Sequence, residues 1–293
     1  MFKGSMVAII TPFKNNGKVI DEKCLKKLVA FQIKNGTSAI VPCGTTGESA
    51  TLSIKEHEKV MDIVIKAAKG KAKVIAGTGS NNTEEAIELT THAKKAGADG
   101  ALVITPYYNK PTQEGIYRHF KALSDATTIP IIAYNIASRT GVNIEPRTMA
   151  RLAGIKNVVG VKEASGGLNQ MSETRRLCGE EFDLISGDDS LTLPLLAIGG
   201  CGVISVVANI VPKDVSNMVA AFFEGDLDKA RELHYKMLPL INAMFIETNP
   251  IPVKAAMHMM GMIEPGLRLP MCEISSDNRK RLKEALTDYG ILA

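Results

Sequence analysis

The run NVVGVK, residues 157–162, is short, apolar and rich in β-branched side chains, and it lacks the strict alternation of a half-exposed strand. Strands of a parallel sheet that is covered on both faces have this pattern. Seven similar runs recur at intervals of about thirty residues, which is the length of a strand plus a crossover helix. They are MVAIIT (6–11), SAIVPC (38–43), KVIAGT (73–78), GALVIT (100–105), PIIAYN (130–135), FDLISG (182–187) and GVISVV (202–207).

Helical patterns fill the segments between these runs. Residues 53–69 place Ile54, Val60 and Ile63 on one side of a helix, and residues 83–96 open on TEEA, which is similar to a capping box. Eight strands that alternate with helices predict an α/β fold, a (β/α)8 TIM barrel. An open, doubly wound sheet is the alternative, because alternation alone does not show that the sheet closes.

The chain continues beyond the last expected barrel helix, which ends near Glu224. Three further helical segments follow, at residues 226–244, 250–260 and 276–286. We therefore predict a TIM barrel with a C-terminal helical appendage. The barrel, with the active site, is expected at residues 1–224 and the C-terminal helical domain at residues 225–293.

The composition is that of an ordinary globular protein, with 45% hydrophobic and 23% charged residues. The net charge of +4 comes from 35 basic and 31 acidic residues that are spread along the chain. A nucleic-acid partner is not expected, because such proteins gather their basic residues in a patch or stripe. The five cysteines form no CxxC pair and the histidines no HExxH motif, so neither a disulfide framework nor a metal site is expected. A cytoplasmic location fits this cysteine usage.

One uncharged segment, residues 190–212, is long enough to be considered as a membrane span. Pro194 and the glycine pair at 199–200 interrupt it, so we expect a buried helix followed by a buried strand, and no membrane partner. The first residues, MFKGSMVAIITPF, reach Pro12 too early for a signal peptide.

Lys162 ends the run 157–162, where a barrel strand meets its following loop and where barrel enzymes keep their catalytic residues. It is the only lysine among the interior strand ends. A lysine amine can form a Schiff base with a carbonyl compound, but only when it is neutral, and a poorly solvated pocket favours that form. The alternative is a side chain that extends to solvent and has no chemical role.

Other strand ends carry groups that suit this chemistry. Tyr134 ends the preceding run and could move protons during imine formation, although a buried tyrosine more often serves packing. The turn CGTTGES (43–49) offers backbone amides and hydroxyls to an anion, but it lacks the lysine of a P-loop and equally fits a tight turn before a helix. Arg139 can hold a substrate carboxylate with its guanidinium, and a surface ion pair is the alternative.

Five ordered motifs, GTTGE, PYYNKP, YNIASRTG, GVKEASG and NPIPVKAA, resemble those of the dihydrodipicolinate synthase (4-hydroxy-tetrahydrodipicolinate synthase) family. The likeness runs from about Gly4 to the end of the chain. It implies a lyase of the class I aldolase type, in which Lys162 forms a covalent imine with pyruvate and no separate cofactor is needed. The enamine then attacks L-aspartate 4-semialdehyde, the first committed step of diaminopimelate and lysine biosynthesis.

The resemblance also implies roles for individual residues. Lys162 is the nucleophile, and Tyr134, Thr45 and Tyr108 match the proton relay of the family. The positions implied to bind substrate are Thr45, Thr46, Arg139, Gly187 and Ile204. In the family, the tyrosine that matches Tyr108 reaches into the site of a neighbouring subunit, which implies a homodimer or homotetramer.

Two departures from the family pattern have expected consequences. Ile136 and Ala137 stand where a proline is common, so the loop that bears Arg139 is expected to be less rigid. Ile54 replaces a polar or charged residue at the site where the family binds lysine as a feedback inhibitor, so we predict weak or no inhibition by lysine. The positions that match this regulatory site are Ser49, Ala50, Ile54, His57, Asn81, Glu85 and Tyr107.

Two other functions remain open from the sequence. An N-acetylneuraminate lyase or 2-keto-3-deoxy sugar acid aldolase shares the scaffold, the Schiff-base lysine and the glycine-rich turn, but Tyr108 and Arg139 favour a small carboxylated aldehyde. A non-catalytic barrel that serves as a binding module is the second alternative, because a fold does not fix a function. Such a protein would not need Lys162, Tyr134, Thr45 and Tyr108 together.

Overall fold

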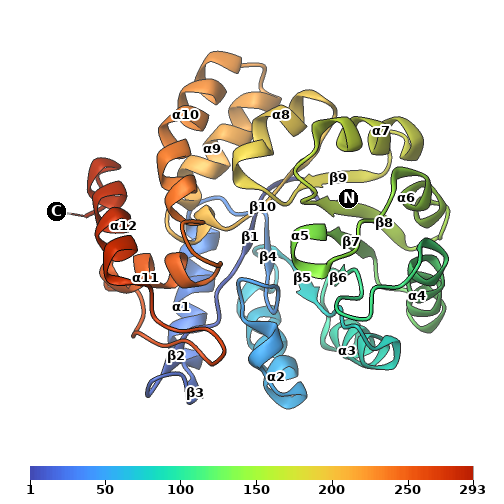
Figure 1. The fold of residues 1–293 in the computed structure, drawn as a ribbon, viewed down its shortest axis with the longest axis horizontal. Helices are drawn as coiled ribbons and strands as arrows, with labels where there is room; N and C mark the ends of the chain where they lie inside the picture. The colour runs from blue at the N-terminus through green and yellow to red at the C-terminus, as the bar shows by residue number, and fades with distance from the viewer. Residues whose placement is uncertain (293) are drawn as a thin grey trace.

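The eight apolar runs form one closed parallel barrel in the computed structural model, which describes residues 1–292 (Figure 1). Around the barrel the strand order is β1-β10-β9-β8-β7-β6-β5-β4, and β4 pairs again with β1. The predicted TIM barrel is therefore confirmed and the open sheet is wrong. The strands are β1 (Gly4–Ala8), β4 (Ala39–Val41), β5 (Lys73–Gly77), β6 (Gly100–Ile104), β7 (Ile131–Asn135), β8 (Val158–Glu163), β9 (Asp183–Ser186) and β10 (Gly202–Ser205).

Helices cover the outside of the barrel (Figure 1). They are α1 (Glu22–Lys34), α2 (Ile54–Ala68), α3 (Thr83–Ala96), α4 (Gln113–Ala126), α6 (Pro146–Ala153), α7 (Leu168–Cys178), α8 (Thr192–Ala197) and α9 (Pro212–Phe223). The short helix α5 (Ala137–Thr140), which carries Arg139, instead lies beside β7 toward the middle of the ring (Figure 1). Short 3-10 helices lie at η1 (Ser49–Thr51), η2 (Asp189–Leu191) and η3 (Val207–Asn209).

The N-terminal caps of α2 and α3 differ in how well the sequence predicts them. Helix α2 begins with a true capping box, in which the side chains of Ser53 and Glu56 each accept a backbone N–H of the other residue. Helix α3 does not use TEEA as its cap. Its N-cap is Asn82, whose side chain accepts from the Glu84 N–H, and the Thr83 hydroxyl instead lies 3.0 Å from Nδ1 of His119. Asparagine is among the strongest N-cap residues, so the cap lies one residue earlier than predicted.

Apolar side chains fill both faces of the strands. On β7, Ile131 and Ala133 pack against the surrounding helices, whereas Ile132 and Tyr134 point into the barrel. The interior cluster also contains Met6, Leu102, Ile185 and Ile204, all buried. The floor beneath the interior strand ends is therefore apolar.

The C-terminal helices α10 (Leu227–Ala243), α11 (Ile251–Met259) and α12 (Ser276–Asp288) confirm the predicted appendage (Figure 1). Helix α10 packs along the barrel helix α9, and α11 contacts η3. The appendage therefore packs against the part of the barrel formed by α9 and η3. The division between residues 224 and 225 stays a prediction.

Two smaller segments complete the picture. A hairpin that was not predicted is formed by β2 (Phe13–Lys14) and β3 (Val19–Ile20), and its turn places Asn15, Asn16 and Gly17 at positive φ. The uncharged segment 190–212 folds as expected, with α8 followed by β10. Among the helices of residues 1–292, none is long and apolar enough to cross a membrane.

Candidate active site

Lys162 and Tyr134 lie opposite each other on neighbouring strands. They are paired in register across β7 and β8, and each is 5% exposed. The Nζ atom of Lys162 lies 4.2 Å from the centre of the Tyr134 ring. Within residues 1–292, no hydrogen bond or ion pair joins this Nζ to another residue. The alternative of a side chain that extends to solvent is therefore wrong: the side chain is buried above the apolar interior, and its amine has no charge partner among these residues.

The carboxylate of Glu163 faces away from this amine. It is fully buried and accepts hydrogen bonds from Nδ2 of Asn135 at 3.1 and 3.2 Å and from the Ser165 N–H at 2.8 Å. Asn135 also pairs with Glu163 in register, one step beyond Tyr134 and Lys162. The outward-facing pair of Asn135 and Glu163 thus holds the ends of β7 and β8 together. The inward-facing pair of Tyr134 and Lys162 on the same strands is the candidate catalytic pair.

Gly187, the residue that follows β9, leaves room for the side chain of Lys162. A Cβ atom at this position would lie 3.1 Å from Cε of Lys162 and 2.8 Å from Cβ of Ala164. Any larger residue would push against the Lys162 side chain. Ile204 is 1% exposed and belongs to the same interior cluster as Tyr134, so neither Gly187 nor Ile204 adds a polar side chain beside Lys162.

The glycine-rich turn after β4 is held by a hydrogen bond within its own backbone and by the side chain of Thr11. The Glu48 N–H donates to the Thr45 carbonyl at 3.1 Å, and the Thr11 hydroxyl donates to the Gly47 carbonyl at 2.7 Å. Thr46 is buried and Thr45 is half-buried. The turn leads directly into η1, so it is a tight strand-to-helix connection that also presents two hydroxyls.

Asn249, just before α11, connects two predicted substrate-binding residues. Its Nδ2 donates to the Thr46 hydroxyl at 3.0 Å, and its carbonyl accepts from a guanidinium nitrogen of Arg139 at 3.1 Å. Its Oδ1 is buried without a hydrogen-bond partner in residues 1–292. Asn249 opens the motif NPIPVKAA, but nothing local in the sequence predicts these contacts.

A cavity of about 340 Å³ extends from the turn and Arg139 toward α2 and α3. The predicted regulatory residues Ser49, Ala50, Ile54, His57, Glu85 and Tyr107 line it, together with Thr45, Arg139 and Asn249. Asn81 lies beside it and donates to the Tyr107 carbonyl at 3.2 Å. His57 bonds the Gly77 carbonyl at 2.7 Å, and burial lowers the pKa of its ring, so this histidine also serves packing.

Tyr108 is placed differently from the other predicted residues. It is 89% exposed and has a φ of 71°, a left-handed conformation that is uncommon for a residue with a Cβ. The chain therefore brings Lys162, Tyr134 and Gly187 together and leaves Tyr108 at the surface.

The fold and this site define a class of protein. A closed barrel with a buried, unpaired lysine beside a tyrosine at its strand ends is the arrangement of an enzyme that works through a Schiff base. The profile of the Dihydrodipicolinate synthetase family matches residues 1–289. The chain belongs to this family.

Relatives over the full length agree. The 4-hydroxy-tetrahydrodipicolinate synthase of Syntrophus aciditrophicus (strain SB) is 58% identical over 292 residues, covering 100% of both chains. The crystal structure of dihydrodipicolinate synthase from Aquifex aeolicus is 52% identical with a TM-score of 0.97, covering 99% of both chains. The enzyme from Acinetobacter baumannii, solved in complex with pyruvate, is 46% identical with a TM-score of 0.97 and full coverage of both.

The predicted function is confirmed by these relatives: a 4-hydroxy-tetrahydrodipicolinate synthase, a lyase that works through a Schiff base in lysine and diaminopimelate biosynthesis.

Proposed function

We propose that the protein condenses pyruvate with L-aspartate 4-semialdehyde through an imine on Lys162. The observation that carries this proposal is the buried amine beside the Tyr134 ring, without a carboxylate partner in residues 1–292. The amine attacks the C2 carbonyl of pyruvate, and the resulting carbinolamine loses water to give the imine. Loss of a proton from C3 gives the enamine, which attacks the aldehyde carbon before the product cyclises and leaves Lys162 as a free amine.

Tyr134 is proposed to move the protons of these steps. This role is supported by its ring, which lies 4.2 Å from the amine and so keeps the phenol beside the nucleophile. Thr45, in the turn across the barrel mouth, is proposed to pass the proton on. General acid–base groups of this kind must reach the reacting atoms in the loaded enzyme, although their hydrogen bonds are often longer in the free one.

The carboxylates of the two substrates are proposed to bind at different elements. Thr45 and Thr46 would hold the carboxylate of pyruvate with their hydroxyls and backbone amides. Arg139 would hold the carboxylate of the semialdehyde, because a guanidinium offers several N–H donors and only one is used by Asn249. Gly187 and Ile204 would shape the space around the imine.

Self-association is proposed to complete the site. Tyr108 is highly exposed and held in a left-handed conformation, as expected of a side chain that serves a neighbouring subunit. A homodimer is the smallest assembly that would use it, and two such dimers would form the homotetramer. A cytoplasmic location is also proposed, which the five free cysteines support.

Inhibition by lysine is proposed to be weak or absent. Ile54 places an apolar side chain in the cavity beside Ser49 and Glu85. A charged ligand would have to give up part of its hydration against this side chain without gaining a polar contact.

The test of the substrate assignment is turnover by the wild-type protein. We expect product from pyruvate with L-aspartate 4-semialdehyde and no cleavage of N-acetylneuraminate. Arg139→Met should raise KM for the semialdehyde more than KM for pyruvate, because only one carboxylate loses its guanidinium. Cleavage of the sugar acid without condensation would contradict the proposal.

A further inference from the structure

The C-terminal appendage reaches the glycine-rich turn through a buried ion pair. Lys254 lies on α11, and its Nζ is 2.5 Å from Oε1 of Glu48, the last residue of GTTGE. The two side chains are 3% and 1% exposed. The residues are far apart in the sequence, so this pair is a tertiary contact between the appendage and the barrel mouth.

Lys254 is fully engaged in this position. Its Nζ also donates to the Thr11 carbonyl at 3.1 Å and lies 4.3 Å from the centre of the Phe13 ring. Burial lowers the pKa of Lys254, and the Glu48 carboxylate partly opposes that effect. A buried ion pair keeps its geometry only when its remaining hydrogen-bonding capacity is satisfied, and here it is.

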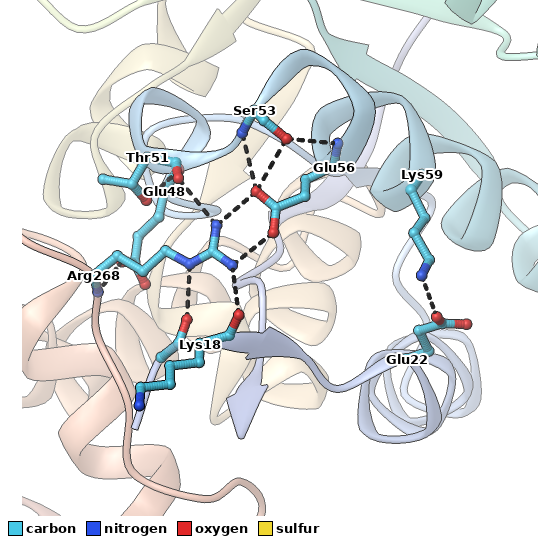
Figure 2. Close-up of polar contacts among 9 residues, drawn as sticks. Lys18, Glu22, Glu48, Thr51, Ser53, Glu56, Lys59 and Arg268 are labelled. Carbon is cyan, nitrogen blue, oxygen red and sulfur yellow. Dashed lines mark hydrogen bonds and ion pairs between the residues drawn. The ribbon is translucent and has the colours of Figure 1, made fainter. Parts of the chain in front are cut away.

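Arg268, in the segment between α11 and α12, holds the other oxygen of the same carboxylate. Its backbone N–H donates to Oε2 of Glu48 at 3.1 Å. Figure 2 shows its guanidinium between Glu56 and the hairpin residue Lys18, with Thr51 on a third side. The guanidinium donates to both oxygens of Glu56, at 2.7 and 2.8 Å, and to the Thr51 carbonyl at 3.0 Å.

Glu48 needs this support because of its backbone. Its φ of 54° lies in the left-handed region, which is unfavourable for a residue with a Cβ. Its N–H bonds the Thr45 carbonyl, and its carbonyl accepts from the Thr51 N–H at 3.0 Å. The side chain thus anchors a strained residue that is hydrogen-bonded directly to Thr45.

We propose that Lys254 and Arg268 are positioning residues for the substrate-binding turn, which they hold through Glu48 so that Thr45 and Thr46 meet the carboxylate of pyruvate. The inference rests on the proposed function, because it assigns that carboxylate to the turn. It makes the appendage part of the active-site machinery. A small displacement of a positioned group can lower a rate by up to about 10²-fold, so such support has measurable value.

The test compares two appendage lysines. The double variant Glu48→Gln/Lys254→Met removes both charges of the pair and leaves no isolated charge behind. The control is Lys236→Met, because Lys236 on α10 also pairs with a barrel carboxylate, Asp214, at 2.8 Å and lies over an aromatic ring, that of Tyr289, although this pair is more exposed. None of these control contacts involves the turn. Both proteins are assayed for kcat, both KM values, thermal unfolding and the rate of borohydride trapping with pyruvate.

We expect the double variant to raise KM for pyruvate about tenfold and to slow trapping, within the range that a displaced group produces. KM for the semialdehyde should change much less, and Lys236→Met should resemble the wild type. A purely structural role would lower the melting temperature and leave the ratio of the two KM values unchanged, which would overturn the inference. If the double variant does not fold, the second variant is Arg268→Lys, which keeps the backbone N–H that donates to Glu48 but loses the paired guanidinium bonds to Glu56 that fix this backbone. It should show a smaller rise in the same KM. An unchanged KM for pyruvate in that variant would also overturn it.

The two proposals fail in different ways. No pyruvate adduct on Lys162 of the wild type would contradict the proposed function and this inference together. An adduct that forms as fast in the folded double variant as in the wild type would contradict the inference alone.

Discussion

Lys162 and Lys254 are two buried lysines with different partners. Both are at most 5% exposed, and both place Nζ over an aromatic ring, at 4.2 Å from Tyr134 and 4.3 Å from Phe13. Lys254 has a carboxylate at 2.5 Å and a carbonyl at 3.1 Å, whereas Lys162 has neither among residues 1–292. Burial and an aromatic neighbour therefore do not identify a nucleophile. What separates Lys162 is its place at an interior strand end beside Tyr134, with no carboxylate of residues 1–292 holding its amine, because a nucleophile must be free to reach a carbonyl.

The largest expected effect is the loss of the nucleophile. Lys162→Ala should lower kcat by roughly 10⁴-fold or more, the scale expected when a covalent catalytic group is removed. The variant should keep its melting temperature, because the lost amine has no ion-pair partner in residues 1–292. Steady-state kinetics with both substrates measure the change. Turnover close to that of the wild type would place the nucleophile elsewhere.

Removing only the phenol should have the next largest effect. Tyr134→Phe keeps the ring over Lys162 and deletes the proton-carrying hydroxyl, so kcat should fall by about 10²- to 10⁴-fold. Tyr117→Phe is the control, because the Tyr117 ring packs under Arg151, away from the site. Equal kinetics for the two variants would remove Tyr134 from the proposed relay.

Replacing Lys254 should destabilise the protein more than replacing Lys162, the reverse of the expected order for activity. Lys254→Met leaves the Glu48 carboxylate buried and unpaired, so the free energy of unfolding should fall by about 3 to 5 kcal/mol. Lys162→Met deletes an amine that pairs with no carboxylate of residues 1–292, so no such fall is expected. Urea denaturation of both variants measures the difference. The comparison of the two lysines fails if Lys162→Met is destabilised as much as Lys254→Met.

The pH dependence of stability tests the outer part of the Glu48 network. The Arg268 guanidinium beside Glu56 lowers the pKa of that carboxyl from 4.5 to about 2. A depressed carboxyl pKa stabilises the folded state fully above about pH 4.5, and this contribution is lost as the pH falls toward 2. The difference in melting temperature between the wild type and Glu56→Gln should therefore be constant from pH 7 to pH 5 and shrink below pH 4.5. A difference that stays constant at pH 3 would contradict this assignment.

The smallest expected effect is that of added lysine. Because Ile54 lines the cavity beside α2, we expect activity to stay nearly constant when lysine is titrated into the assay. Strong inhibition would show that the cavity accepts lysine despite the apolar side chain.

The sequence predicted most of the architecture because that part depends on local pattern. Eight apolar runs specified eight strands, and Lys162 and Tyr134 stood out because polar groups at interior strand ends are rare. Closure of the barrel could be inferred only from the number of strands. The TEEA cap was placed one residue late because Asn82 and Thr83 are both good cap residues.

The contacts of Lys254 and Asn249 could not be predicted in the same way. In NPIPVKAA, Lys254 looks like any lysine on a helix, and nothing local indicates that it faces a carboxylate 206 residues earlier. The left-handed φ of Glu48 has no local signal in the sequence either. The hairpin of β2 and β3 had a visible signal, the turn residues Asn15, Asn16 and Gly17, which the reading in terms of barrel strands overlooked.

The central claim is that Lys162, and not the equally buried Lys254, is the nucleophile. Borohydride reduction in the presence of pyruvate, followed by digestion and peptide mass spectrometry, tests it directly. We predict a reduced pyruvate adduct on the peptide that carries Lys162 and an unmodified peptide that carries Lys254. An unmodified Lys162, or an adduct on Lys254, would contradict it.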